Sequence, residues 1–170
     1  MTDKKAIMDE IGVYRYSLTR EWTPTIFSPY AEIMRCVFIG LNPSTADAEK
    51  DDPTIRRCIG FARRFGCSSL EMVNLFAYRA TNPRELQSSR LRKNVYGPEN
   101  SRHIIEAARR GIYIIAAWGR PRWDFVRATA ETVIKMLELR KIFLHCLGKT
   151  SEGFPRHPLY LPKDAKLEIL

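Results

Sequence analysis

Short apolar runs alternate with segments of helical periodicity along this chain, and that alternation limits the possible folds more than any other feature. The runs are residues 36–39, 70–75, 112–118 and 142–147. Continuous apolar stretches of this length are typical of strands buried on both faces. Strands that alternate with helices predict an α/β fold, here a three-layer α/β/α arrangement around a mostly parallel central sheet. The length of 170 residues predicts a single domain that spans residues 1–170.

Local signals place the helices between these runs. Asp52 is expected to cap a helix that has Pro53 at its first position and that Gly66 ends. A second helix is predicted to start at Asn100 or Ser101, and a longer one precedes the last apolar run. These positions agree with helices that cross over between parallel strands.

Two further segments have a different pattern. Residues 12–22 alternate between apolar and polar side chains, which predicts a half-exposed strand. Residues 87–99 are polar and basic, which predicts a surface loop. We find no internal repeat and no linker that would divide the chain.

Composition limits the classes of protein that the chain can belong to. No stretch approaches the roughly 18 apolar residues that a membrane span requires, and the N-terminal segment lacks the apolar region of a secretion signal. The four cysteines include no Cys-x-x-Cys pair and the three histidines are scattered, so the spacing predicts neither a metal site nor a cofactor. We therefore expect a cytoplasmic monomer without a membrane partner.

The formal net charge of +9 at pH 7 favours a polyanionic partner. We expect nucleic acid, DNA rather than RNA, or a nucleotide, and an inert solvated surface is the alternative. The residues that we single out for contact with a nucleic-acid backbone are Arg90, Arg92, Lys93, Lys149 and Arg156. For residues 88–94, a solvated loop is the alternative explanation.

The segment 40–47, Gly-Leu-Asn-Pro-Ser-Thr-Ala-Asp, follows the first apolar run and is the predicted functional centre. Ligands of open α/β sheets bind outside the carboxyl ends of the strands, where this segment is expected to lie. Gly40 permits close backbone approach, Asn42 offers a donor and an acceptor, and Pro43 restricts the backbone. The other candidate ligand contacts are Leu41, Ser44 and Thr45. The segment matches neither a Walker loop nor Gly-x-Gly-x-x-Gly, and a tight turn is the alternative.

Several motifs connect the chain to a known family. They are the segment 40–47, Asp52-Pro53-Thr54, Val73-Asn74-Leu75, Trp118-Gly119 and His157-Pro158-Leu159-Tyr160. On these motifs the chain is identified as a member of the bacterial and phage family catalogued as domain of unknown function 1643. The resemblance covers most of the sequence, and the family name implies no activity.

The order of the motifs is also similar to that of the uracil-DNA glycosylase superfamily, especially its mismatch-specific branch. Residues 40–44 resemble the Gly-x-Asn-Pro-Gly loop that follows the first core strand of those enzymes. The resemblance implies a uracil-DNA-glycosylase-like fold in which Asn42 positions the attacking water, Asn74 reads the base edge and His157 stabilises the departing base. Glycosidic cleavage leaves negative charge on the base, which an aimed hydrogen-bond donor stabilises.

A flipped base must also be enclosed by apolar or aromatic side chains. The candidates for this role are Phe76, Tyr78, Trp118 and Trp123, with Tyr160 as a further ligand-binding residue. For any one of these aromatic residues, ordinary core packing is the alternative. The chain departs from the superfamily at Leu159, where a serine is expected, and at Asn42, which stands in place of a water-activating aspartate. Asp47 is the candidate base instead, and a solvated or capping role is its alternative.

Three functions are compatible with this pattern. The first is a DNA glycosylase-like hydrolase that excises a flipped base by N-glycosidic cleavage, with modified and mismatched bases among the candidates. The second is a non-catalytic module that binds a nucleotide or nucleic acid in the same pocket. The third is a metal- or phosphate-handling enzyme that uses Asp47, Asp51 and Asp52, although Asp52 is better explained as a helix cap. A shared fold does not decide between them.

Overall fold

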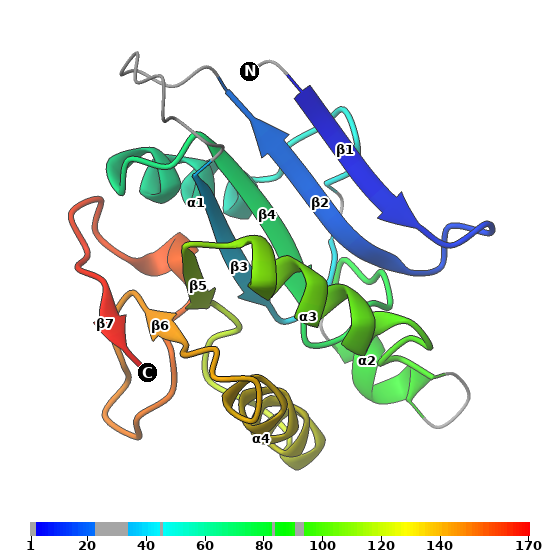
Figure 1. The fold of residues 1–170 in the computed structure, drawn as a ribbon. Helices are drawn as coiled ribbons and strands as arrows, with labels where there is room; N and C mark the ends of the chain where they lie inside the picture. The colour runs from blue at the N-terminus through cyan, green and yellow to red at the C-terminus, as the bar shows by residue number, and fades with distance from the viewer. Residues whose placement is uncertain (1–2, 23–33, 45, 83, 91–93) are drawn as a thin grey trace.

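Within the described residues, the chain forms a seven-stranded sheet with helices on both faces (Figure 1). The computed structural model describes residues 3–22, 34–44, 46–82, 84–90 and 94–170. The strands, in chain order, are β1 (Asp3–Met8), β2 (Arg15–Glu21), β3 (Arg35–Gly40), β4 (Ser69–Asn74), β5 (Tyr113–Ala116), β6 (His145–Cys146) and β7 (Glu168–Ile169). The helices are α1 (Pro53–Arg64), α2 (Arg84–Ser89), α3 (Asn100–Arg110), α4 (Asp124–Glu138) and the 3₁₀ helix η1 (Pro158–Tyr160).

The sheet is mixed rather than mostly parallel, and its strand order is β1-β2-β4-β3-β5-β6-β7. The neighbours β4, β3, β5 and β6 run parallel, as the alternation of strands and helices predicts. The pairings of β2 with β4, of β1 with β2 and of β7 with β6 are antiparallel. β1 and β2 are joined by a short turn, and so short a connection can join only antiparallel strands.

Alternate residues of β3 point to opposite faces of the sheet. Val37 and Ile39 lie in a cluster with α3 and α4, whereas Cys36 and Phe38 lie in a cluster with α1. All of these side chains are fully buried. Because helices cover both faces of the central strands, the sequence of β3 is continuously apolar.

The strand predicted over residues 12–22 is present as β2, but the expected half exposure is wrong, because β2 is largely buried. Leu18 packs into the cluster on the α1 side. Tyr16 stacks on His103 of α3 with 4.7 Å between the ring centroids. Arg15, in the polar phase of the alternation, and Arg20, in its apolar phase, are both buried.

These two arginines of β2 hold the segment 46–51, which continues the predicted functional loop. Arg20 donates from Nη2 to the Asp47 carbonyl oxygen at 2.5 Å and from Nε to Asp51 Oδ1 at 2.7 Å. Arg15 donates from Nη1 to the carbonyl oxygen of Ala46. A buried guanidinium needs such partners, and here they fix the loop against the sheet.

The helix start at Asp52 is confirmed, since its Oδ1 accepts a hydrogen bond from the Ile55 amide at 2.8 Å and Pro53 is the first residue of α1. The helix start at Asn100 is also confirmed. The strand predicted over residues 142–147 is reduced to β6, and α2 occupies part of the predicted loop. These boundaries depend on pairing and packing rather than on local composition.

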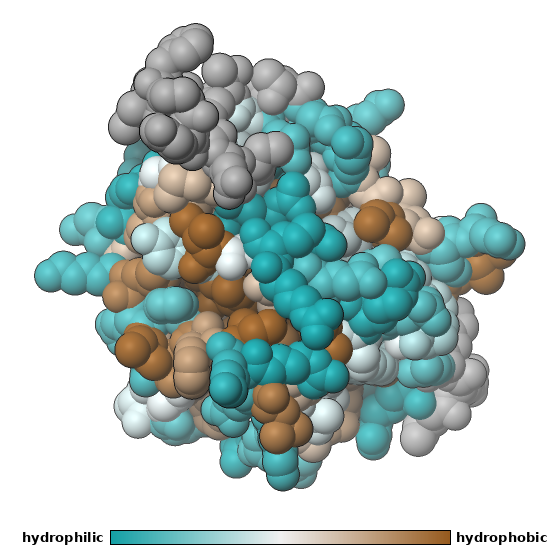
Figure 2. Space-filling view, viewed as in Figure 1, coloured by the Kyte–Doolittle hydropathy of each residue, from teal (hydrophilic) through white to brown (hydrophobic). Residues whose placement is uncertain are grey.

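Exposed apolar side chains near the β5–β7 edge include Ile112, Phe143 and Ile169. Figure 2 shows hydrophobic surface over this part of the molecule, whereas hydrophilic residues cover much of the rest of this view. None of the helices in the described part of the chain is both long and apolar enough to span a membrane.

Candidate functional site

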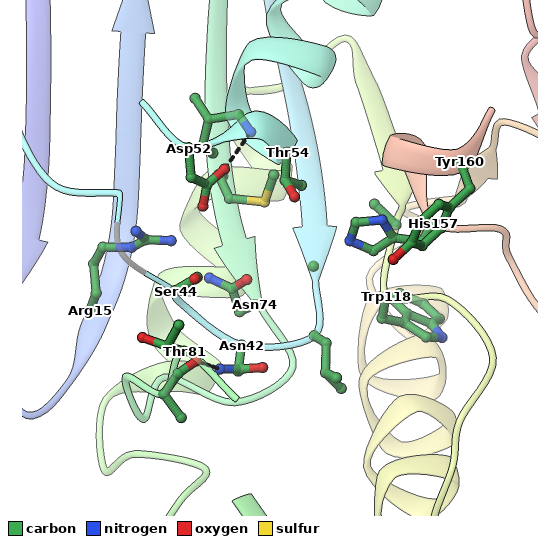
Figure 3. Close-up of a pocket in the computed structure, with 16 residues that line it drawn as sticks. Arg15, Asn42, Ser44, Asp52, Thr54, Asn74, Thr81, Trp118, His157 and Tyr160 are labelled. Atoms are coloured by element: carbon green, nitrogen blue, oxygen red, sulfur yellow. Dashed lines mark hydrogen bonds between the residues drawn. The ribbon is translucent and has the colours of Figure 1, made fainter. Parts of the chain in front are cut away.

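A pocket of about 230 Å³ opens where β3 and β4 end, beside the segment that follows β5 (Figure 3). This is the edge at which the carboxyl ends of the parallel strands meet. The side chains and backbone that line it come from several separate segments: Arg15; Gly40, Leu41, Asn42 and Ser44; Asp52, Thr54 and Ile55; Met72 and Asn74; Ala80 and Thr81; Ala117 and Trp118; His157 and Tyr160. The structure therefore brings Asn42, Asn74 and His157 into one pocket.

Gly40 and Asn74 form neighbouring parts of the pocket wall. They are register partners in the parallel pairing of β3 with β4. A Cβ atom at residue 40 would lie 2.7 Å from Asn74 Oδ1, so glycine leaves the space that the amide occupies. Asn74 is 3% exposed, and its Nδ2 has no hydrogen-bond partner among the described residues. An unpaired buried donor is costly, and a ligand oxygen at this position would satisfy it.

The amide of Asn42 has its donors occupied and its acceptor open. Nδ2 donates to the carbonyl oxygens of Pro43 at 3.0 Å and Ala80 at 2.7 Å. These bonds fix the side-chain amide between the loop after β3 and the loop after β4. No described residue donates to Oδ1 among the hydrogen bonds of the site, so this oxygen can accept a proton from water or a ligand.

His157 enters the pocket from the loop that precedes η1. Its Nδ1 accepts a hydrogen bond from the Leu159 amide at 3.3 Å, which places the proton of the neutral ring on Nε2. Burial lowers the pKa of His157 from its ordinary value of 6.5, and the Asp52 carboxylate opposes that shift. The ring is therefore neutral at pH 7 and still presents an N–H donor.

Helix α1 holds the segment that carries His157. Arg57 donates to the carbonyl oxygen of Leu161, and Arg64 donates to that of Ala165. Arg57 and Arg64 also lie over the ring of Phe61, at 5.1 and 5.7 Å from its centroid. The basic face of α1 thus has a structural role in positioning the C-terminal segment.

Four predicted site residues lie outside the pocket lining. Asp47 Oδ1 accepts the amide hydrogens of Glu49 at 2.9 Å and Lys50 at 2.8 Å, which lowers the pKa of this carboxyl and uses it in a turn. Phe76 packs edge-on against Phe125 in the core. Tyr78 packs against the same core, and Pro43 is buried. Thr45 lies outside the described residues.

The pocket contains residues that sequence reasoning missed, namely Arg15, Thr54, Ile55, Met72, Ala80, Thr81 and Ala117. Thr54 belongs to a motif quoted for the family, so the helix start was an available signal. Arg15 had no such signal, because it has the sequence pattern of an outward-facing residue in a half-exposed strand. Asp52 was predicted mainly as a helix cap, with a metal- or phosphate-binding role as the alternative, and it also lines the pocket.

A larger groove of about 850 Å³ adjoins the pocket and shares Leu41, Trp118, His157 and Tyr160 with it. Its other lining residues include Arg120, Arg122, Trp123 and Arg156. Of the predicted backbone-contacting residues, the groove therefore contains Arg156. Arg90 instead lies over the ring of Phe125, and Lys149 forms a β-bridge with Pro155. Arg92 and Lys93 lie outside the described residues.

The carboxylates considered as metal ligands have other partners. Asp51 pairs with Arg20 at 2.7 Å, Asp52 caps α1, and Asp47 closes its turn. Across the part of the chain that the structure describes, no three histidine, cysteine, aspartate or glutamate side chains gather in a metal-binding arrangement.

The fold and the pocket define a mixed α/β protein with a ligand-sized site at the carboxyl ends of its parallel strands. The chain belongs to the family described as "Protein of unknown function (DUF1643)", whose model matches residues 15–159. Neither a curated protein nor a solved structure matches the chain.

Proposed function

We propose that this protein is a DNA glycosylase-like hydrolase, with a three-layer fold related to the uracil-DNA glycosylases, that excises a flipped base. The observation that carries the proposal is the convergence of Asn42, Asn74 and His157 on one pocket from three separate segments. The volume of about 230 Å³ lies just below the range of about 300–1,000 Å³ for drug-sized ligands, which suits a single base.

Each of the three residues has a free group suited to one part of the reaction. Asn42 Oδ1 accepts a hydrogen from the water that attacks the sugar carbon, and Asn74 Nδ2 donates to an oxygen on the edge of the base. As the water oxygen bonds to carbon, the N-glycosidic bond breaks and its electron pair leaves with the base. The Nε2–H of His157 donates to the carbonyl oxygen of that anion, and the proton from water passes to solvent.

The surroundings supply the remaining requirements of base flipping. Trp118 and Tyr160 line the pocket beside His157 and provide aromatic surface for the base (Figure 3). The adjoining groove with Arg122 and Arg156 offers cationic groups to the phosphates of the strand.

A panel of fluorescent oligonucleotides tests this function. Single- and double-stranded DNA that contains uracil, a G·T mismatch or a modified pyrimidine is incubated with the full chain and then heated in alkali, which cleaves abasic sites. We expect strand cleavage at one or more of these bases and none in the matching unmodified strand. The absence of cleavage across the panel would contradict the enzymatic function.

A non-catalytic binding module is the second candidate, and the position of Asp47 favours it. Asp47, the residue predicted to act as the general base, is held in its turn outside the pocket lining. The Asp47 carboxylate is therefore not in the pocket to help Asn42 deprotonate the attacking water. Tight, salt-sensitive binding of the same oligonucleotides without cleavage would identify this function.

The protonation state of His157 is a separate prediction. An NMR titration of its ring protons is expected to have its midpoint below 6.5, because burial disfavours the charged ring. In Asp52→Asn the midpoint should fall further, since the carboxylate that raises the pKa is removed. Glu131→Gln, an exposed change on α4, serves as the control. A midpoint at or above 6.5 in the wild-type protein would contradict the neutral donor.

A further inference from the structure

Arg15 is a buried cation in the pocket wall that has no role in the proposed base excision. It is 2% exposed, it lines the pocket, and its Nη1 donates to Ala46. Its Nε has no hydrogen-bond partner among the described residues. Burial lowers the pKa of Arg15 to about 10, which still leaves the guanidinium charged at neutral pH. A buried charge with an unpaired donor is costly unless a ligand completes its hydrogen bonds.

Arg15 lies on the side of the pocket opposite His157, with Asn42, Ser44 and Asn74 between them (Figure 3). Its guanidinium group points toward the pocket rather than away from it. In the proposed function, His157 contacts the carbonyl oxygen of the base that lies near the sugar, and Asn74 contacts an oxygen on the adjacent edge. With the base in this orientation, only a substituent on the edge farthest from the sugar reaches the space beside Arg15.

Asp52 supplies a complementary acceptor at the start of α1. One of its oxygens, Oδ1, accepts from Ile55, and the carboxylate interacts electrostatically with Arg15. The pocket wall thus combines a cation, an anion and the hydroxyls of Ser44 and Thr54. An anionic substituent would be repelled by Asp52 and a cationic one by Arg15, whereas a neutral hydroxyl can accept from Arg15 and donate to Asp52.

We infer that Arg15 and Asp52 form a subsite for a small neutral substituent that both accepts and donates hydrogen bonds, such as the hydroxymethyl group of a modified pyrimidine. This inference rests on the proposed function, because it assigns the orientation of the base from His157 and Asn74. A base with a methyl group in the same place leaves the buried donor of Arg15 unpaired. Sites built around a hydroxyl discriminate against analogues that lack it for this reason.

Arg20 provides a matched control for Arg15. Both arginines belong to β2, both are buried, and both donate to carbonyl oxygens of the segment 46–51. Only Arg15 of the two lines the pocket. Arg15→Met and Arg20→Met each remove a buried guanidinium and a hydrogen bond to a carbonyl oxygen of the loop. Arg20→Met also removes the ion pair with Asp51, so it disturbs the loop at least as much, and only Arg15→Met changes the pocket lining.

Calorimetric titration with free bases tests the subsite without requiring catalysis. The wild-type protein is expected to bind 5-hydroxymethyluracil about tenfold more tightly than thymine, which differs from it by one hydroxyl. The ratio should approach one in Arg15→Met and stay near its wild-type value in Arg20→Met. The comparison of the two bases on the wild-type protein stands even if a variant does not fold.

The results separate this subsite from the proposed function. Any of four results would overturn the subsite. The wild-type protein could bind 5-hydroxymethyluracil and thymine with equal affinity, bind 5-carboxyuracil more tightly than 5-hydroxymethyluracil, or bind no base at all. The fourth result is loss of the preference for 5-hydroxymethyluracil in Arg20→Met. If the protein excises uracil from DNA but binds 5-hydroxymethyluracil and thymine with equal affinity, the glycosylase function is supported and the subsite is not. Selective binding of 5-hydroxymethyluracil without excision from any oligonucleotide would support the subsite and contradict the glycosylase.

Discussion

An Asn42→Ala variant is expected to excise bases about 100- to 1,000-fold more slowly than the wild-type protein under single-turnover conditions. The substitution removes Oδ1, the acceptor that would hold the attacking water, and losses of this size follow the removal of one group that acts directly in a transition state. The rate is measured by alkaline cleavage of the best oligonucleotide substrate. Binding of that oligonucleotide should change far less than the rate, because the base edge and the leaving group are contacted by other residues.

Asn42 also has a structural role, because its Nδ2 donates to the carbonyl oxygens of Pro43 and Ala80 and so connects two loops. This role requires a separate check. Thermal unfolding of the variant shows whether the loops are disturbed. Asn94→Ala is a suitable control, since Asn94 accepts from Gly97 in a turn outside the pocket lining. A wild-type excision rate in a folded Asn42→Ala protein would exclude the proposed role of this residue.

A Gly40→Ala variant is expected to weaken base binding by about 100-fold or more and to bring excision below detection. The added Cβ would lie 2.7 Å from Asn74 Oδ1, closer than such atoms approach, and 3.4 Å from the Met72 sulfur. Either the amide leaves its position or β3 moves away from β4. A misplacement of about 1 Å in a positioning group can cost a factor of about 100. Calorimetric titration of the free base measures the effect independently of the reaction.

Gly60 provides the matched control for this change. It lies on α1, and an added Cβ there meets nothing within 4 Å. Gly60→Ala should raise the free energy of unfolding by about 0.5–1 kcal/mol, because alanine is the better helix former, and should leave base binding unchanged. Unchanged base affinity in Gly40→Ala would show that Asn74 has no part in recognition.

The candidate site was partly predictable because its components follow strands. Residues that come directly after neighbouring parallel strands meet at one edge of the sheet, so Asn42 and Asn74 could be expected together from their positions after β3 and β4. His157 was placed with them by motif order, although it follows the short strand β6 by a loop. Phe76 and Tyr78 were predicted beside the base for the same reason, but the chain turns their rings into the core.

Local sequence also determined the capping of α1 and the burial of β3. A cap needs only Asp52 and the amides that follow it, and a strand covered on both faces must be apolar throughout. The edge strand β1 escaped prediction because it begins with three charged residues and shows no regular apolar alternation, and charged residues are common on exposed edges. The mixed direction of the sheet escaped prediction because β1 and β7 carry little apolar pattern, and because local sequence does not show that β2 pairs antiparallel with β4.

The sequence by itself determined the alternation of strands and helices, the start of α1 and the loop at Gly40, because each depends on neighbouring residues. Only the tertiary structure decided that Arg15 is buried, that Asp47 turns away and that Asp52 lines the pocket. An arginine in an alternating strand has the same sequence pattern whether water or a loop covers it. Arg15 is covered by residues 46–51, which lie more than thirty positions after it in the chain. The contacts that hold this segment on β2 exist only once the sheet has formed.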